Sequence, residues 1–398
     1  MNFTKMSPNS SESSLNGESK SIDKYFIAKA LSLAKKAHGL TSPNPLVGAV
    51  VVKDGTIIGA GYHKKAGLPH AEISALKKAG SNARGATLYV NLEPCSHFGK
   101  TPPCIYKIKE CGIKRVVAAI SDPNPLVSGK GLDYLHNNGI ETVCGVLEEK
   151  AKKLNEVFLK YIASGSPFVT IKEALTLDGK IGYRNDKGKS YISSEKSLEY
   201  THGLRFLNDG IMVSAKTVIK DDPMLDIRLN RRGIKNKLLN KRYTKIILDA
   251  DLSIPLNSRI FDTYGDILIF ASIEYDKEKS VKRLLLKEKG AIICDVYYNS
   301  TSIEGKRFLN LREVFKRCGE LKITSIFVEA GPILFNSLIR EKLFDKLVIN
   351  MMPYILGYEK GLGLFESLSL RDKDMLKFKD LSVKNINDEL FLSYYPEV

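Results

Sequence analysis

The sequence predicts two different α/β domains joined in one chain. Its 398 residues exceed one ordinary domain, and a composition with 43% hydrophobic and 27% charged residues is typical of globular proteins. Helix-like and strand-like segments alternate along both halves, which favours mixed α/β folds over all-helical or all-strand ones. No repeat relates the two halves, so we expect two unlike domains rather than a duplication.

The N-terminal segment predicts a disordered tail. Residues 1–20 are rich in Ser and Asn, poor in large apolar side chains and without periodicity. They contain Glu12 and Glu18 but no Arg, which disfavours a transit peptide. Order is expected from about Ser21, a candidate N-cap for a helix whose apolar residues share one face.

The first domain is expected over residues 21–165, as an α/β sandwich. Val47–Lys53 and Thr56–Tyr62 flank Asp54-Gly55, a pair that favours a two-residue type I′ hairpin turn. Helices and strands then alternate. The expected helices are Ala71–Ala79, Ile105–Glu110, Leu132–Asn137 and Glu148–Tyr161, and the expected strands are Thr87–Asn91, Arg115–Ile120 and Glu141–Val146.

The second domain is expected over residues 166–398. Ala163–Pro167 is small, polar and helix-breaking, which is typical of a linker. A second α/β series follows it. Its expected strands are Phe168–Ala174, Gly210–Ser214, Lys245–Asp249, Asp266–Ala271, Ser325–Glu329, Lys346–Met352 and Leu390–Tyr394, and its expected helices are Ser194–Leu207 and Ile333–Glu341.

Composition excludes several classes of protein. No apolar run reaches the roughly 18–20 residues that a bilayer span needs, so we expect no membrane segment. Six cysteines in a chain of this length are too sparse for a disulfide scaffold, and no secretory apolar core opens the sequence. A reducing, cytoplasmic location is therefore expected.

The net charge of +16 has two interpretations. It could indicate a nucleic-acid partner, or a lysine-rich surface on an enzyme that binds a few phosphates. Only residues 230–242 concentrate basic side chains, and elsewhere they are spread out. We favour the second interpretation.

Three residues of the first domain have the chemistry of a catalytic zinc site. His70 opens a predicted helix, and Cys95 and Cys104 each lie at a predicted strand-to-helix junction. One imidazole and two thiolates leave the fourth tetrahedral position for water, as catalytic rather than structural zinc does. Zinc lowers the pKa of that water toward neutrality, and Glu72 would carry the proton from the water to the departing amine.

This combination matches the His-x-Glu and Pro-Cys pattern of zinc deaminases, although either part alone is common. His97 lies between the cysteines and is either a rival ligand or a substrate contact, and we favour the contact. Cys111 and Cys144 have ordinary helix and strand settings and are expected in the core. Eight residues separate Cys95 from Cys104, against two in the nucleic-acid deaminase pattern, so the loop would wrap a different substrate.

The second domain lacks a Rossmann signature, because no Gly-x-Gly-x-x-Gly follows a strand. Glu329-Ala330-Gly331-Pro332 instead joins an apolar strand to a helix. A glycine at a helix N-terminus lets backbone N–H groups approach a phosphate, but a tight strand-to-helix turn has the same pattern.

At this point the sequence resembles the bifunctional deaminase–reductase family of riboflavin biosynthesis. The resemblance runs in order from about residue 23 to 395, and its most specific part is the long segment between the two cysteines. The motifs that carry it are Pro43-Asn44-Pro45-x-Val47-Gly48, His70-Ala71-Glu72, Glu93-Pro94-Cys95-Ser96-His97, Thr101-Pro102-Pro103-Cys104, Asp122-Pro123-Asn124-Pro125, Leu177-Asp178-Gly179-Lys180, Asp221-Asp222-Pro223 and Glu329-Ala330-Gly331-Pro332.

The resemblance implies a cytidine-deaminase-like α/β/α sandwich followed by a dihydrofolate-reductase-like α/β domain. The zinc domain would hydrolytically deaminate 2,5-diamino-6-(5-phosphoribosylamino)pyrimidin-4-one, a phosphorylated small molecule. The second domain, an oxidoreductase, would then use NADPH to reduce the ribosyl group to ribityl. Family members often form homo-oligomers through the reductase domain, and the sequence leaves that state open.

The resemblance also implies binding residues. Asn44 and residues 63–70 would border the pyrimidine pocket, and Gly331 to about Ser337 would form a loop for the cofactor phosphate. The implied cofactor-binding residues are Ala174, Tyr191, Thr217, Asp221, Ala250, Gly331, Pro332 and Ser337. The implied substrate-binding residues are Lys172, Ser190, Arg205, Leu225, Arg228 and Glu329. Tyr191 stands where relatives commonly have Trp, and Asp178 follows the strand that carries Lys172. The sequence does not reveal the proton donor of the reduction, for which Asp221 and Lys172 are only candidates.

Two alternatives remain open at this stage. One is a nucleic-acid or nucleobase zinc deaminase with an accessory reductase-like domain, which the net charge suggests. The absence of Trp and the long cysteine spacing disfavour it. The other is a metal-binding or regulatory protein that has lost one activity, which the intact Glu72 disfavours.

Overall fold

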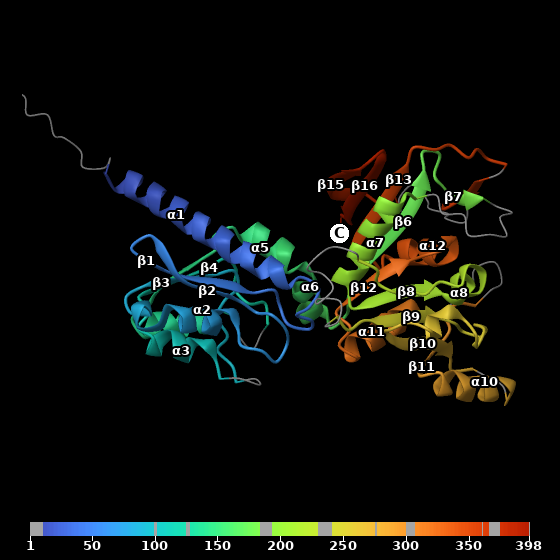
Figure 1. Cartoon of the computed structure of the whole chain (residues 1–398), viewed down its shortest axis with the longest axis horizontal. Coiled ribbons are helices and arrows are strands. Elements are labelled where there is room, and N and C mark those ends of the chain that lie inside the picture. The colour runs from blue at the N-terminus through green and yellow to red at the C-terminus, as the bar shows by residue number, and fades with distance from the viewer. Residues whose placement is uncertain are drawn as a thin grey trace, which may run out of the picture. The chain divides into compact units, whose positions relative to one another are not determined.

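The computed structural model describes residues 11–98, 102–124, 128–183, 193–229, 241–274, 277–299, 307–359, 361–365 and 375–397. The chain divides into two compact units, Met1–Ala163 and Ser164–Val398, both drawn in Figure 1. Each is a mixed α/β fold, and each is considered on its own. Within the described ranges, none of the helices combines the length and apolar character that crossing a bilayer requires.

The first unit is built on a five-stranded sheet with the order β2-β1-β3-β4-β5. The β1–β2 and β1–β3 pairs are antiparallel, and the β3–β4 and β4–β5 pairs are parallel. The strands are β1 Gly48–Lys53, β2 Thr56–Tyr62, β3 Thr87–Val90, β4 Arg115–Ala118 and β5 Glu141–Cys144, and the helices are α1 Ser11–Ala34, α2 Ala71–Ala79, α3 Cys104–Glu110, α4 Lys130–Asn137, α5 Glu148–Leu154 and α6 Glu156–Ser164.

Apolar side chains alternate between the two faces of this sheet, so each face has its own core. Ala49 and Val51 pack in one core with residues of α2, α3 and α4, whereas Val50 and Val52 pack in another with residues of α1 and α5. Figure 1 shows α1 along one face and α2 and α3 on the other. The predicted α/β/α sandwich is therefore confirmed.

The hairpin turn follows its sequence signal. Asp54 and Gly55 have φ values of 49° and 73°, and a type I′ turn needs positive φ at both positions. Adding residues to an existing helix is favourable, so α1 begins at Ser11 and not at the expected N-cap Ser21. The expected tail is thus wrong for residues 11–20, and residues 1–10 lie outside the described part of the chain.

Asn155 divides the single helix expected over 148–161 into α5 and α6. Its buried side chain accepts a hydrogen bond from the Leu46 N–H at 2.8 Å and donates to the Leu46 carbonyl at 3.1 Å. A tertiary contact therefore overrides a continuous helical pattern. Cys144, expected in the core, is exposed because β5 is an edge strand.

A buried ionic network ties α1 to the sheet. Asp23 accepts two hydrogen bonds from the Arg115 guanidinium, at 2.7 and 2.9 Å, and one from the Tyr89 hydroxyl at 3.0 Å. Arg115 also pairs with the exposed Glu141 at 2.7 Å. Burial and the charge of Asp23 raise the pKa of Tyr89, so Tyr89 remains a donor.

We expect Asp23→Ala to destabilise the first unit by about 3 kcal/mol, because it leaves the buried Tyr89 hydroxyl without its acceptor and removes the main partner of the partly buried Arg115. Amide hydrogen exchange of β3 and β4 peptides in the full chain measures this loss of stability. Glu141→Ala is the matched control and should cost less than about 1 kcal/mol, since that carboxylate is exposed. Equal protection in the Asp23→Ala and Glu141→Ala variants would contradict the role of the network.

The second unit contains a nine-stranded sheet with the order β11-β10-β9-β8-β12-β6-β13-β16-β15, and β7 pairs with β14 apart from it. The strands from β11 to β13 in this order are parallel, and β16 and β15 are antiparallel. The strands are β6 Phe168–Thr176, β7 Lys180–Tyr183, β8 Gly210–Ser214, β9 Thr244–Leu248, β10 Asp266–Ser272, β11 Ala291–Val296, β12 Ser325–Glu329, β13 Lys346–Met352, β14 Gly361–Gly363, β15 Phe378–Ile386 and β16 Glu389–Pro396. The helices are α7 Glu195–Leu207, α8 Ala215–Asp221, α10 Lys277–Glu288, α11 Leu311–Glu320 and α12 Pro332–Glu341.

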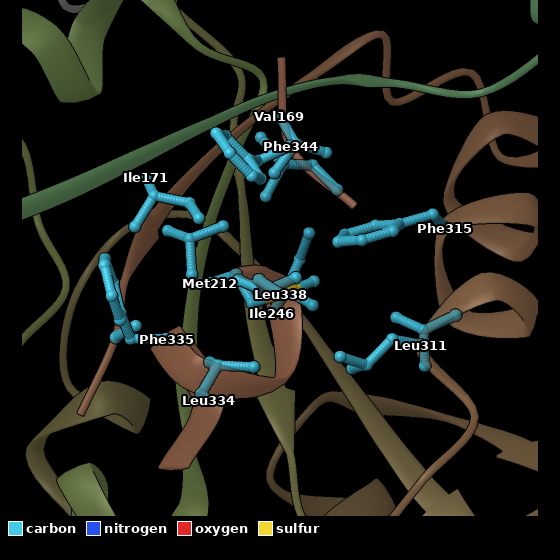
Figure 2. Close-up of a cluster of buried hydrophobic side chains, with 14 of the residues drawn as sticks. Val169, Ile171, Met212, Ile246, Leu311, Phe315, Leu334, Phe335, Leu338 and Phe344 are labelled. Atoms are coloured by element: carbon cyan, nitrogen blue, oxygen red, sulfur yellow. The ribbon is translucent and has the colours of Figure 1, made fainter. Parts of the chain in front are cut away.

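Two cores cover the faces of this sheet. Figure 2 shows one of them, where Ile171 and Met212 of the sheet lie with Phe315 of α11 and with Phe335 and Leu338 of α12. On the opposite face, residues of β8, β9 and β10 pack with residues of α8 and α10. Parallel strands covered on both faces leave their carboxyl ends as the edge where ligands bind.

Candidate active sites

The expected zinc ligands converge at the start of two helices of the first unit. His70 precedes α2, Cys104 is the first residue of α3, and Cys95 follows β3. The His70 Nδ1 atom lies 3.2 Å from the Cys104 Sγ atom and 3.5 Å from the Cys95 Sγ atom. All three ligand atoms lie within 4.8 Å of one another.

This donor set fits a zinc ion. Bonds of about 2.0–2.1 Å to nitrogen and about 2.3 Å to sulfur, at tetrahedral angles, place N and S about 3.5 Å apart. The Cys104 N–H at the start of α3 points at the Cys95 Sγ atom, 3.3 Å away. Hydrogen bonds from Cys104 and His70 lower the pKa of Cys95 to about 4, and the bond to Cys95 raises the pKa of His70. The hydrogen bond between the two cysteines raises the pKa of Cys104, so Cys95 is the first of the two thiols to ionise.

Glu72 lies within the first turn of α2, buried beside these ligands. Its Oε2 atom has no hydrogen-bond partner, which is unusual for a buried carboxylate. Burial, with the negative charge of Cys95, raises its pKa to about 7. A carboxyl group with that pKa can both take and return a proton near neutral pH.

His63 and Asn44 flank the same site. The Asn44 Nδ2 atom lies 3.1 Å from His63 Nε2, and His63 Nδ1 lies 3.3 Å from the Pro69 carbonyl oxygen. The amide donates to Nε2, so Nδ1 carries the proton and donates to Pro69. Burial lowers the pKa of His63, which keeps the ring neutral, and its ring contacts His70 edge-on at 5.5 Å. Both residues thus lie beside His70, where the resemblance implies the border of a pyrimidine pocket.

His97 lies apart from the ligand cluster. His97 is exposed. Among the described residues, the group that could hold a metal ion consists of His70, Cys95 and Cys104 and does not include His97. A role as rival ligand is therefore wrong for this conformation.

Glu93 organises the segment that leads to Cys95, a role that its position in the motif did not reveal. One carboxylate oxygen accepts hydrogen bonds from the N–H groups of Asp122 and Gly129 at 3.0 and 2.9 Å. The other accepts from Gly131 at 2.8 Å and Leu132 at 3.3 Å, at the start of α4. A Cβ atom at Gly131 would come within 2.2 Å of the Pro94 carbonyl oxygen, so the close approach requires glycine.

We expect Glu93→Gln to speed the loss of zinc to a chelator about tenfold, because outer groups that orient metal-binding segments contribute to affinity. An amide supplies one acceptor oxygen and would present N–H donors to the other backbone N–H groups. Zinc release followed with a coloured chelator measures the effect. Glu110→Gln on the exposed surface of α3 is the control, and identical release rates would overturn the role of Glu93.

In the second unit, three of the expected substrate residues form one polar cluster. Lys172 of β6 and Glu329 of β12 are direct partners in the parallel register, so their side chains share a face. The Arg205 guanidinium of α7 binds Glu329 through two bonds of 2.8 and 2.6 Å. Burial alone would raise the pKa of Glu329, but Arg205 and Lys172 outweigh it and lower that pKa. Burial lowers the pKa of Lys172.

The segment after α8 completes this cluster. The Arg205 NH1 group donates to the Asp226 carbonyl at 2.8 Å, and Arg228 Nε lies 3.2 Å from an Asp226 carboxylate oxygen. The Arg228 N–H donates to His202 Nδ1 at 3.2 Å. Burial, and then the charges of Arg205 and Arg228, lower the pKa of His202 to about 4, so it is a neutral acceptor.

His202 and Asp226 were not expected at this site, although Leu225 and Arg228, implied by the resemblance, already pointed to the segment. Leu225, expected to bind substrate, has its side chain buried in the core at φ 49°. Any ligand contact of Leu225 would therefore come from its backbone.

The expected cofactor residues follow the carboxyl ends of neighbouring parallel strands. Ala174 lies on β6, Thr217 and Asp221 on α8 after β8, and Ala250 after β9. Gly331 and Pro332 follow β12. Parallel strands bring their carboxyl ends to one edge, so the topology gathers these residues where open α/β sheets bind ligands. Ser190 and Tyr191 lie outside the described residues.

The expected phosphate loop from Gly331 to Ser337 is instead the first turns of α12. Gly331 is its N-cap and makes no side-chain capping bond, so first-turn N–H groups are available to an anion. A Cβ atom at Gly331 would meet no protein atom within 4 Å, so space for a phosphate adjoins the helix end. Ser337 is buried, and its hydroxyl donates to the Ile333 carbonyl at 2.9 Å.

Asp178 has a structural role. It accepts hydrogen bonds from the Thr176 hydroxyl at 2.6 Å and from the N–H groups of Leu356 and Gly357 at 3.2 and 2.8 Å. It thereby joins the turn after β6 to the segment after β13. These hydrogen bonds shape the edge of the sheet where ligands are expected, and they occupy both carboxylate oxygens of Asp178.

Fold and site together define a class of protein, a zinc-dependent deaminase unit joined to a nucleotide-dependent reductase unit. The sequence matches the model of the cytidine and deoxycytidylate deaminase zinc-binding region over residues 20–120. It matches the RibD C-terminal domain over residues 167–392.

Similar proteins cover the chain almost from end to end. The riboflavin biosynthesis protein RibD of Aquifex aeolicus is 42% identical, over 94% of this chain and 98% of that protein. The Escherichia coli protein of the same name is 36% identical, over 90% and 96%. The solved structure of Acinetobacter baumannii RibD is 32% identical, covers 95% of this chain and 100% of its own, and has a TM-score of 0.83.

A second solved structure carries a fuller description. A diaminohydroxyphosphoribosylaminopyrimidine deaminase/5-amino-6-(5-phosphoribosylamino)uracil reductase from Thermotoga maritima is 34% identical. It covers 95% of this chain and 99% of its own, with a TM-score of 0.79.

The chain belongs to the RibD family. It is a bifunctional deaminase and reductase of riboflavin biosynthesis that acts on a small-molecule pyrimidine. Its cofactors are zinc in the first unit and NADPH in the second. The predicted fold class, deaminase followed by reductase, is confirmed.

Proposed function

We propose that the chain converts 2,5-diamino-6-(5-phosphoribosylamino)pyrimidin-4-one to its ribityl product in two steps. Residues 21–165 form the deaminase domain and residues 166–398 the reductase domain. The observation that carries the first step is the convergence of His70, Cys95 and Cys104 beside the buried Glu72, whose Oε2 atom has no hydrogen-bond partner.

In the first step, His70, Cys95 and Cys104 hold the metal. Zinc, when bound there, supplies a Lewis acid that activates water near neutral pH. Glu72 takes a proton from the water and returns it to the leaving nitrogen. The C2–N bond breaks as the C2–O bond forms, so water is consumed and ammonia is released.

In the second step, NADPH, when bound, supplies the hydride. The ribose ring opens as C1′ is reduced, and a proton must reach the released oxygen. Lys172 and Asp221 are the candidates for that donor, and the burial of Lys172 beside Glu329 favours Lys172. Arg205 and Arg228 supply positive charge for a substrate phosphate, which guanidinium groups bind through paired hydrogen bonds.

The implied ligand contacts of the second unit belong to this proposal. The nicotinamide and ribose would lie near Ala174, Tyr191, Thr217, Asp221 and Ala250, with the cofactor phosphate at Gly331, Pro332 and the helix that carries Ser337. Lys172, Ser190, Arg205, Leu225, Arg228 and Glu329 would surround the ribosyl substrate.

We also propose that the enzyme is cytoplasmic and has no nucleic-acid or membrane partner, with oligomerisation, where it occurs, through the reductase domain. The long spacing between the cysteines and the lack of Trp support a small-molecule substrate over a polynucleotide.

The test measures ammonia release and NADPH oxidation in the same reactions. The purified full chain receives the diaminopyrimidine nucleotide with and without NADPH, and single-stranded DNA and RNA in parallel reactions. We expect ammonia from the nucleotide in both cases, with NADPH oxidised only after deamination. Ammonia from the polynucleotides alone, or NADPH oxidation that precedes ammonia, would contradict the proposal.

A further inference from the structure

A fully buried lysine stands behind the substrate cluster of the second unit. Lys245 of β9 has no exposed surface. Its Nζ atom donates to the Ile260 carbonyl at 2.6 Å, and to the Thr263 carbonyl and hydroxyl at 2.8 and 2.6 Å. An ammonium group has three protons, so each has an acceptor. Burial lowers the pKa of Lys245 to about 8, which leaves it largely protonated at neutral pH.

The Thr263 hydroxyl connects Lys245 to a second segment of the chain through hydrogen bonds. An ammonium group only donates, so the hydroxyl accepts from Lys245 and must use its own proton elsewhere. That proton goes to the Met224 carbonyl, 2.8 Å from the Thr263 Oγ1 atom. The direction of the relay from Lys245 through Thr263 to Met224 is therefore fixed.

Met224 belongs to the irregular segment that enters the site. Two residues further on, the Asp226 carbonyl accepts from Arg205, and the Arg228 N–H donates to His202. At the other end of the segment, the Asp222 carboxylate accepts from the Arg259 N–H at 2.8 Å. Lys245 thus fixes the turn at residues 259–263 by hydrogen bonds, and this turn binds residues 222 and 224.

We propose that Lys245 and Thr263 are positioning residues that place the Met224–Arg228 segment for binding of the phosphorylated ribosyl substrate. This inference rests on the proposed assignment of Arg205 and Arg228 to that substrate. Neither residue of the relay touches the ligand, so both act through the main chain of the segment. The relay should therefore affect substrate affinity more than the chemical step.

The test uses paired variants of Thr263 in the full enzyme. Thr263→Val keeps the shape but removes the hydroxyl, which leaves the Met224 carbonyl and one Lys245 proton without a partner. We expect the KM of the reductase for 5-amino-6-(5-phosphoribosylamino)uracil to rise about tenfold, with kcat within about twofold. Ammonia release should be unchanged. Thr263→Ser keeps the hydroxyl and should restore KM to within about twofold.

Four results separate the possible failures. An unchanged KM in a folded Thr263→Val variant would overturn the relay, as would a rise in KM that Thr263→Ser shares. If Arg228→Ala also leaves KM unchanged, the assignment of the substrate site has failed instead. Should Thr263→Val lower only the melting temperature, the two residues are structural, and the proposal is again overturned.

Discussion

Replacing Glu72 with Gln is expected to lower the rate of ammonia release by about 10²–10⁴-fold, the range that a well-placed proton carrier contributes. The substitution keeps the size of a buried side chain but removes its ability to take a proton. Glu72 does not belong to the donor set, so zinc should remain bound. The reductase turnover of a supplied deaminated substrate should be unaffected, because that chemistry occurs in the other unit.

The controls for Glu72→Gln address metal and fold separately. Zinc content should equal that of the unmodified chain, and circular dichroism should be unchanged. Ammonia release within about threefold of the unmodified chain, with zinc retained, would remove Glu72 from the mechanism. Loss of zinc would show that Glu72 supports the metal and does not serve only as a proton carrier.

Replacing Arg205 with Met is expected to lower the kcat/KM of the reductase by about 10²–10³-fold. Arg205 donates twice to Glu329 and once to the Asp226 carbonyl, so its loss leaves a buried carboxylate unpaired and frees the segment that carries Arg228. Truncating one partner of a buried charge pair costs about 2–5 kcal/mol, and the partly buried Arg205–Glu329 pair should lie within that range, which spans about 30- to 5,000-fold in rate.

Steady-state kinetics with varied substrate measure the effect of Arg205→Met. The kcat/KM of Arg205→Lys should lie between those of the unmodified chain and Arg205→Met, because lysine keeps the charge but not the paired geometry. Arg317→Met, which removes an exposed arginine paired with Glu320, is the matched control and should leave kcat/KM unchanged. Equal kinetics in the Arg205→Met and Arg317→Met variants would exclude the cluster from the reductase site.

Local sequence was sufficient for the metal site. His70, Glu72, Cys95 and Cys104 lie in three short motifs, and His70 and Cys104 each lie where a helix begins. Elements with strong local signals were also placed well. Strand β13 spans Lys346–Met352 as expected, and Ser194 caps α7 by accepting a hydrogen bond from the Ser197 N–H.

Residues whose roles depend on distant partners could not be predicted in this way. Lysine is ordinarily a surface residue, and nothing local marks Lys245 as buried, since its acceptors lie 15 and 18 residues away. Glu93 binds backbone N–H groups 29 to 39 residues further on. The break at Asn155 depends on Leu46, 109 residues earlier.

Edge elements were missed for a different reason. Strand β15 is exposed along most of its length, so it lacks the apolar alternation that identifies a half-buried strand. The helix expected from Ile333 begins one residue earlier, because Pro332 is suited to the first position of a helix, and the expected phosphate loop therefore overlaps its first turns.

The central claim is that His70, Cys95 and Cys104 hold a catalytic zinc, and its most direct test is the zinc content of the purified full chain by elemental analysis. We expect about one zinc per chain. Cys104→Ala should abolish zinc binding, and Cys111→Ala, which removes a cysteine outside the cluster, should retain it. A zinc-free chain, or equal zinc in both variants, would contradict the assignment of this site.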